Sequence, residues 1–157
     1  MSIEAARAFF QERGIEDRIQ EFPVSSATVE LAAQALGVAP ERIAKTLSFK
    51  RDDSAILVVA AGDARIDNKK FKATFGTKAK MLSPDEVVEL VGHAVGGVCP
   101  FGIKDGIDVY IDDSVKRFST VFPAVGSANS AIELSCEELY TYSNACSWVD
   151  VCKLPEA

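Results

Sequence analysis

The sequence predicts an α/β (α+β) fold: a single domain, residues 1–157, with a mixed, barrel-like β-sheet surrounded by short helices. Three observations lead to this prediction. Segments with strand character outnumber segments with helical periodicity, and short helices fall between the strands at uneven intervals, unlike a regular doubly wound fold. No internal repeat, low-complexity segment or linker divides the chain. A chain of 157 residues can also bury a core of its own.

Five segments are predicted to be helical because each has an apolar face between a capping residue and a stop signal. The clearest is 83–92, where Ser83 is the cap, Pro84 suits the first turn and Gly92 follows the end. Single extra turns of helix are expected at 40–44 and 115–118. In chain order the five segments are 2–14, 25–38, 68–76, 83–92 and 135–142.

The clearest strands form a hairpin over residues 45–63. Two runs rich in apolar and β-branched residues flank Asp52, Asp53 and Ser54, which favour a turn. The second run is apolar at nearly every position, so we expect that strand to be buried on both faces. Shorter strands are expected at 17–22, 79–82, 106–114, 120–126, 130–134 and 147–153.

The charge balance argues against a protein that coats nucleic acid through a broad basic face, because the net charge is -6. The lysines are nevertheless unevenly distributed along the sequence. They are either part of solvated faces or a local basic rim that meets a few phosphates. Five of them fall within fourteen residues: Lys69, Lys70, Lys72, Lys78 and Lys80.

The N-terminal residues lack the basic-then-apolar order of a signal peptide, and the longest apolar run, 55–62, is too short to span a bilayer. We therefore expect a cytoplasmic protein with no membrane partner.

The four cysteines form no C-x-x-C pair and have no histidine at ligand spacing, so neither a metal nor a disulfide is predicted. His93 and Cys99 either form a Cys–His hydrolase pair or neighbour each other by chance.

Residues 96–102, "GGVCPFG", place three glycines between a predicted helix and a predicted strand. Glycines let a ligand approach the main chain, and successive amides can surround a carbonyl or a developing oxyanion. Pro100 would stiffen the loop and Phe101 could form an aromatic wall; the alternative is a tight connection without a ligand. The pattern is neither a dinucleotide fingerprint nor a phosphate loop, so no nucleotide cofactor is expected.

Several stretches occur together in one order: "ELAAQALGV", "RIAKTLSF", "GDARIDNKKFKATFG", "LSPDEVVELVGHAVGGVCPFG" and "FPAVGSANSAIEL". In this the chain resembles the YbaK/EbsC family, whose members are similar to the editing domain of bacterial prolyl-tRNA synthetase. The resemblance covers about residues 20–152. Its most specific part is the combination of "AKT" at 44–46 with "GGVCPFG".

The resemblance implies a free-standing deacylase that acts in trans on the acceptor end of mischarged tRNA. The substrate would be tRNA(Pro) carrying a small amino acid such as alanine, cysteine or 2-aminobutyrate, and prolyl-tRNA synthetase would be a possible partner. An aminoacyl ester is already activated, so positioning, a donor to its carbonyl and one water suffice. The terminal ribose hydroxyl of the tRNA would help, and no cofactor would be needed.

The resemblance also implies roles for individual residues. Lys45 would hold a phosphate or polar groups of the substrate, although a lysine at the start of a strand can equally be a solvated charge. The amide of Gly97 would border the ester carbonyl. The remaining residues implied to bound the aminoacyl pocket are Thr28, Thr46, Gly96, Val98, Pro100, Phe101, Gly102 and Gly126.

Two departures from the family bear on specificity. Members that act on cysteinyl-tRNA often carry Ser-Gly-Gly where this chain has Ala124, Val125 and Gly126. A position further along the chain that is acidic in those members is Ala131 in this chain. These differences favour another small, uncharged amino acid. Two alternatives to the deacylase stay open: a module of the same fold that binds tRNA ends or a synthetase without hydrolysis, and an unrelated Cys–His hydrolase.

Overall fold

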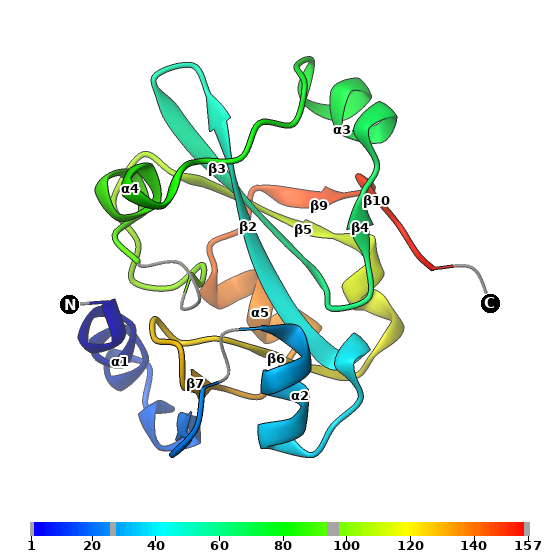
Figure 1. Cartoon of the computed structure of the whole chain (residues 1–157). Helices are drawn as coiled ribbons and strands as arrows, with labels where there is room; N and C mark the ends of the chain where they lie inside the picture. The colour runs from blue at the N-terminus through cyan, green and yellow to red at the C-terminus, as the bar shows by residue number, and fades with distance from the viewer. Residues whose placement is uncertain (1, 26–27, 94–97, 156–157) are drawn as a thin grey trace.

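A mixed six-stranded sheet forms the centre of the computed structural model, which describes residues 2–25, 28–93 and 98–155. The strand order is β8-β6-β2-β3-β5-β9, with β2 and β3 as an antiparallel hairpin. Three parallel pairs, β2 with β6, β3 with β5 and β5 with β9, make the sheet mixed. It curves into half of a barrel (Figure 1), which confirms the predicted fold class. The strands are β2 Ile43–Arg51, β3 Ser54–Ala61, β5 Asp108–Asp112, β6 Thr120–Pro123, β8 Leu134–Ser135 and β9 Ser147–Val149.

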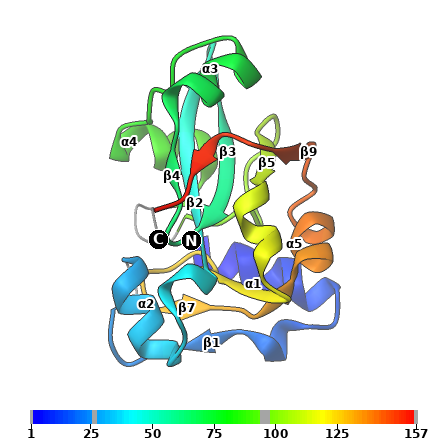
Figure 2. The same ribbon diagram turned by 90° about the vertical axis from the view of Figure 1, so that its right-hand side faces the viewer.

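Short helices and two small ribbons surround this sheet (Figures 1 and 2). One ribbon pairs β1 (Gln20–Glu21) with β7 (Ser130–Ala131), and the other pairs β4 (Arg65–Ile66) with β10 (Cys152–Lys153). The α-helices are α1 Ser2–Glu12, α2 Val29–Leu36, α3 Asn68–Phe75, α4 Pro84–Glu86 and α5 Cys136–Tyr142. Short 3₁₀ turns are η1 Glu16–Arg18, η2 Pro40–Arg42 and η4 Asp113–Arg117.

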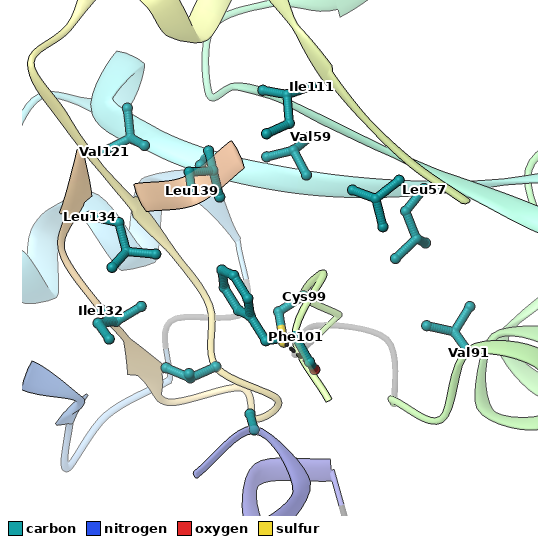
Figure 3. Close-up of a cluster of buried hydrophobic side chains, with 14 of the residues drawn as sticks. Leu57, Val59, Val91, Cys99, Phe101, Ile111, Val121, Ile132, Leu134 and Leu139 are labelled. Carbon is teal, nitrogen blue, oxygen red and sulfur yellow. Dashed lines mark hydrogen bonds between the residues drawn. The ribbon is translucent and has the colours of Figure 1, made fainter. Parts of the chain in front are cut away.

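The sheet is buried on both faces because β3 supplies alternate side chains to two cores. Leu57 and Val59 point into the larger core, which α1 and α5 cover and which Figure 3 shows around Phe101. Ile56 and Val58 point into the second core, which α3 covers. Seven of the eight residues of β3 are buried, so the prediction that this strand is buried on both faces is confirmed.

The helix signals are confirmed at most ends. Thr28 accepts from the main-chain N–H of Leu31, and Asp67 accepts from those of Lys69 and Lys70. The predicted helix 83–92 begins at its Ser83 cap but is not regular throughout. After α4 it continues as the π-helical turn η3 (Val87–Val91), in which Val87 and Val91 are buried.

Several predicted strands are shorter than expected. The predicted strand 130–134 is two strands, because its start pairs with β1 and its end with β6. The predicted strand 147–153 is also interrupted, since the Asp112 carboxylate accepts the N–H of Val151 at 2.9 Å. In the predicted strand 79–82, Met81 alone forms a bridge, opposite Phe49.

Among the described residues, no helix is both long and apolar enough to cross a membrane. The same residues contain no group of three His, Cys, Asp or Glu side chains arranged to hold a metal ion. All four cysteines are free thiols: Cys99 and Cys152 are buried, Cys136 is half-buried and Cys146 is exposed.

Candidate functional site

A cavity of about 420 Å³ lies beside β2, where none of the described strands pairs with the edge of β2. β6 pairs only with Ile43 and Ala44, and the next contact along this edge is the Met81 bridge at Phe49. The interval between them borders the cavity. The lining residues are Thr28, Val29, Ala32, Ile43, Ala44, Lys45, Thr46, Leu47, Ser48, Met81, Leu82, Pro84, Val87, Val98, Phe122, Ala124, Ser130 and Ala131.

The cavity is mainly apolar, with a few polar groups on one strand. Among its described lining residues, Lys45 is the one charged side chain, and no carboxylate faces the space. The other polar side chains are hydroxyls, of which those of Thr46 and Ser48 come from β2. An apolar space with a few convergent polar groups is typical of a small-molecule site.

Lys45 is half-buried, and its ammonium group donates hydrogen bonds to main-chain oxygens rather than to a carboxylate. Nζ donates to the carbonyl oxygen of Gly62 at 3.4 Å and to that of Ala64. Burial lowers the pKa of Lys45, because desolvation opposes the charged form more than the nearby Asp63 carboxylate supports it. An ammonium has three N–H donors, so one is left for a ligand.

Thr46 carries one side-chain group that is left without a hydrogen bond by the described residues. Its Oγ1 is buried and has no hydrogen-bond partner in the described part of the chain. Its main chain also faces the cavity. Leu82 donates to Ser48 O at 3.2 Å, and Lys50 donates to Lys80 O at 2.8 Å, on the side of β2 away from β3. Main-chain groups of alternate residues in a strand face the same side, so those of Thr46 point there too.

The sequence-predicted site residues divide into three groups. Thr28, Lys45, Thr46 and Val98 line the cavity together. Gly96 and Gly97 lie outside the described residues. The remaining four, Pro100, Phe101, Gly102 and Gly126, are absent from the described cavity lining.

Phe101 and Gly102 lie in the core instead of at the cavity wall. Phe101 is fully buried, with its ring centroid 4.7 Å from that of Phe10 on α1. Gly102 has φ +62°, and a Cβ there would lie 2.8 Å from the carbonyl group of Ala5. The end of the glycine-rich segment is therefore packed tightly against α1.

His93 and Cys99 are neighbours in the same core. Both side chains are fully buried, and His93 Nε2 lies 3.6 Å from Cys99 Sγ. His93 Nε2 lies 2.8 Å from the carbonyl oxygen of Phe101, which can only accept, so Nε2 carries the proton and cannot take one from the thiol. Burial raises the pKa of Cys99 to about 12. This geometry gives no support to a thiolate nucleophile.

Two features of the site were not predicted from the sequence. The first is the pair of carbonyl groups, at Gly62 and Ala64, that receives Lys45. The second is the contribution of Met81 and Val87 to the apolar wall. The "GDARID" stretch, residues 62–67, contains the turn that carries both carbonyl groups, but nothing in the local sequence indicates that this turn faces Lys45.

A family model for the aminoacyl-tRNA editing domain matches residues 24–142, which include Thr28, Lys45, Thr46 and Val98. The chain belongs to the aminoacyl-tRNA editing domain family. The resemblance inferred from the sequence motifs is thereby confirmed. Among curated proteins, "Uncharacterized protein YwhH" of Bacillus subtilis (strain 168) is 56% identical to this chain over 154 residues, covering 98% of each chain.

The chain is also similar to part of a longer enzyme and to two solved structures. Proline--tRNA ligase of Geobacillus sp. (strain WCH70) is 32% identical over 90 residues, which are 57% of this chain and 16% of the ligase. The crystal structure of "a putative trans-editing enzyme for prolyl tRNA synthetase" superposes with a TM-score of 0.86 at 29% identity, covering 97% of each chain. The crystal structure of "hypothetical protein APE2540" superposes with a TM-score of 0.78 at 30% identity, covering 90% of this chain and 98% of that one.

Proposed function

We propose that this protein is a trans-editing deacylase: it hydrolyses the ester bond of mischarged aminoacyl-tRNA, with tRNA(Pro) as the acceptor. The observation that carries the proposal is that two neighbouring residues line one mainly apolar cavity: Lys45, whose ammonium is half-buried, and Thr46, whose buried Oγ1 has no partner in the described part of the chain. Membership of the editing family and the similarity to part of proline--tRNA ligase support the choice of substrate.

The polar strand edge suits the terminal adenosine and its ester. The remaining N–H of Lys45 would donate to a phosphate or to an oxygen of the substrate, and such charge-assisted bonds are among the stronger ones. Thr46 Oγ1 would bond a ribose hydroxyl or the α-amino group. A buried hydroxyl without a partner carries a desolvation cost, which a ligand that satisfies it would remove.

The apolar wall suits a small, uncharged amino-acid side chain. Ala124 and Ala131, the positions that depart from the cysteine-specific members, both line the cavity. Their methyl groups offer no hydrogen bond to a polar side chain, and no described lining carboxylate would hold a cationic one. Alanine and 2-aminobutyrate are therefore the preferred side chains, because they leave no buried polar group unpaired.

Hydrolysis would need no covalent intermediate. Water attacks the ester carbonyl, the carbonyl oxygen becomes an oxyanion, and the bond to the ribose oxygen breaks to release the amino acid and tRNA. The main-chain amide of Gly97 is proposed to donate to the oxyanion, and the neighbouring ribose hydroxyl would assist the water. Positioning and oxyanion stabilisation of this kind supply a large share of the rate in acyl transfer.

A deacylation screen tests the proposal. Purified protein would be incubated with tRNA(Pro) charged with alanine, 2-aminobutyrate, cysteine, serine or proline, and loss of the ester would be followed against the spontaneous rate. We expect faster loss from alanyl- and 2-aminobutyryl-tRNA and none from prolyl-tRNA. Lys45→Ala should abolish most of the acceleration, whereas Lys153→Ala, a change at an exposed lysine outside the cavity lining, should not.

Two outcomes would contradict the proposal. Tight binding of charged tRNA without accelerated hydrolysis, with or without prolyl-tRNA synthetase, would identify the non-catalytic module instead. Activity that survives Lys45→Ala but is lost in Cys99→Ala would restore the Cys–His hydrolase.

A further inference from the structure

The turn between β3 and β4, residues 62–64, lies between Lys45 and an arginine from a distant part of the chain. On one side, the carbonyl groups of Gly62 and Ala64 receive the Lys45 ammonium. Between those two residues, the Asp63 carboxylate accepts from both terminal nitrogens of Arg117, with Nη1 at 3.1 Å from Oδ2. The two side chains are partly buried, Asp63 at 16% exposure and Arg117 at 33%.

Arg117 is itself anchored, because its own short helix, η4, is bonded to the end of β3. Arg117 Nε donates to the carbonyl oxygen of Ser114 at 2.9 Å. The buried hydroxyl of Ser114 accepts from the N–H of Ala61 at 3.1 Å, one residue before the turn. The η4 helix therefore contacts this part of the chain at two points: Ala61, at the end of β3, and Asp63, within the turn.

The opposite side of the turn is held by close packing. A Cβ on Gly62 would lie 2.1 Å from the carbonyl oxygen of Pro40 in η2 and 2.8 Å from Cγ1 of Val29 in α2. Glycine is therefore the residue that allows this approach. With η2 and α2 on one side and η4 on the other, the carbonyl groups that face Lys45 have little room to rotate.

We propose that Arg117 and Asp63 are positioning residues for Lys45: their bidentate ion pair fixes the 62–64 turn, whose carbonyl groups direct the third N–H of the ammonium into the cavity. The proposal rests on the function proposed above. A two-point guanidinium–carboxylate contact fixes orientation as well as distance, which a lysine ammonium at position 117 cannot do.

The charges act in the same direction as the geometry. Arg117 lowers the pKa of Asp63, chiefly through the side-chain hydrogen bonds, so the carboxylate stays ionised. That carboxylate in turn supports the charged form of Lys45 against the desolvation that lowers its pKa. Arg117 keeps the carboxylate directed away from Lys45, so the ammonium is not neutralised by a direct ion pair.

The first test measures Lys45 itself and needs no deacylation. NMR titration of the Lys45 Cε resonance, assigned by its absence in Lys45→Ala, would be recorded for the wild type, Asp63→Asn and Arg117→Ala. Asp63→Asn should lower the Lys45 pKa further, because a supporting negative charge is lost. Arg117→Ala should raise it, because the released carboxylate can approach the ammonium. A purely structural role would not produce shifts of opposite sign.

The second test is kinetic. Arg117→Ala and Arg117→Lys should each lower kcat roughly tenfold with KM within about twofold, since a misdirected donor affects the transition state more than binding. Arg51→Ala is the matched control: Arg51 lies at the far end of the same strand as Lys45, β2, pairs with Asp108, and is 39% exposed, close to the 33% of Arg117. It should leave both constants near the wild type.

The two tests separate the possible failures. If the titration shifts are found but no substrate is hydrolysed, the positioning of Lys45 stands and the proposed function fails. If Lys45 titrates in both variants as it does in Arg51→Ala, the positioning proposal is overturned, whatever the activity. Should Arg117→Ala not fold, the conservative Arg117→Lys and Asp63→Asn carry the same test, with thermal melting as the check on folding.

Discussion

Lys45 donates to the carbonyl oxygen of Gly62 across 3.4 Å, so the charged group of the cavity is held by main chain and not by an acidic side chain. This arrangement leaves the ammonium its full positive charge while fixing its direction. A carboxylate in the same place would pair with it and compete with a phosphate or ester oxygen for its N–H groups. The contact therefore favours a lysine that meets an anionic or oxygen-rich ligand.

Lys45→Ala should reduce kcat/KM for deacylation about ten- to hundredfold, because a hydrogen bond to a charged group contributes roughly 1.5–3 kcal/mol. The melting temperature should change little, since the side chain is half-buried and its hydrogen bonds to the described residues go to two main-chain carbonyl groups. Single-turnover rates at low and at saturating substrate would measure the effect. Unchanged rates at both concentrations would remove Lys45 from the mechanism.

Ligand binding should weaken at alkaline pH before an ordinary lysine would lose its proton. Burial lowers the pKa of Lys45 below 10.5, so its charge is complete below the lowered pKa and lost as the pH rises through it. An aminoacyl-adenosine analogue with an amide in place of the ester allows titration without hydrolysis. Binding of this analogue to Lys45→Arg should keep a flat alkaline limb, because arginine stays protonated. The same alkaline loss in both proteins would assign the titration to another group.

Cys99→Ala should leave deacylation close to the wild type and cost about 1 kcal/mol of stability, as expected for deleting one buried heavy atom from a core. The thiol is fully buried, and burial keeps it protonated. Rates and melting curves would be measured on the same preparation. A loss of more than about 10³-fold in rate, as when a nucleophile is deleted, would show that the thiol reacts.

The sequence predicted those parts of the site that lie in one continuous segment or match a motif. The resemblance that includes the "AKT" motif predicted Thr28, Lys45 and Thr46 as pocket residues, and all three line the cavity. The contacts that orient Lys45 were not predicted. Asp63 and Arg117 are 54 residues apart, and each resembles any other surface charge until the fold joins them.

The glycine-rich segment shows a second limit of sequence reasoning. Glycine indicates either a ligand's approach or the approach of another part of the chain, and the local sequence does not distinguish them. At Gly102 the neighbour is the main chain of Ala5 in α1, which is nearly a hundred residues away in the chain. Likewise Phe101 fills the core beside Phe10, although an aromatic residue in a loop also suits a pocket wall.

Gly102→Ala should destabilise the protein by more than about 2 kcal/mol, because alanine at positive φ already costs about 1–2 kcal/mol and its Cβ would also meet α1. Gly106→Ala is the matched control. Gly106 has φ +86°, but a Cβ there would meet nothing within 4 Å, so only the conformational cost applies. Chemical denaturation of both variants measures the difference. Equal losses would show that α1 moves aside without cost.

Binding to tRNA should be local and salt-sensitive, with a log–log slope near -2 to -3. This value follows from about three or four phosphate contacts at roughly 0.7 each on a single-stranded end. The structure reduces the number of lysines that are available for these phosphate contacts. Lys70 donates to Asp150 and to the carbonyl of Cys152, whereas four other lysines are exposed and have no ion pair in the part of the chain described: Lys69, Lys72, Lys78 and Lys80.

These four lysines lie on α3 and on the segment that leads from it to Met81 at the cavity (Figure 1). No acidic residue interrupts residues 68–82, so the segment presents one sign of charge in a chain of net charge -6. A phosphate backbone whose 3′ end occupies the cavity could follow this segment.

Lys72→Glu combined with Lys78→Glu should therefore weaken binding of uncharged tRNA and flatten the slope by about 1.4, at 0.7 per contact. Lys104→Glu is the control, because Lys104 donates to the carbonyl oxygen of Glu89, outside that segment. Titration of labelled tRNA at several salt concentrations measures both quantities. A wild-type slope steeper than about -6, or equal weakening by the control, would mean that the tRNA contacts a much broader surface than this one.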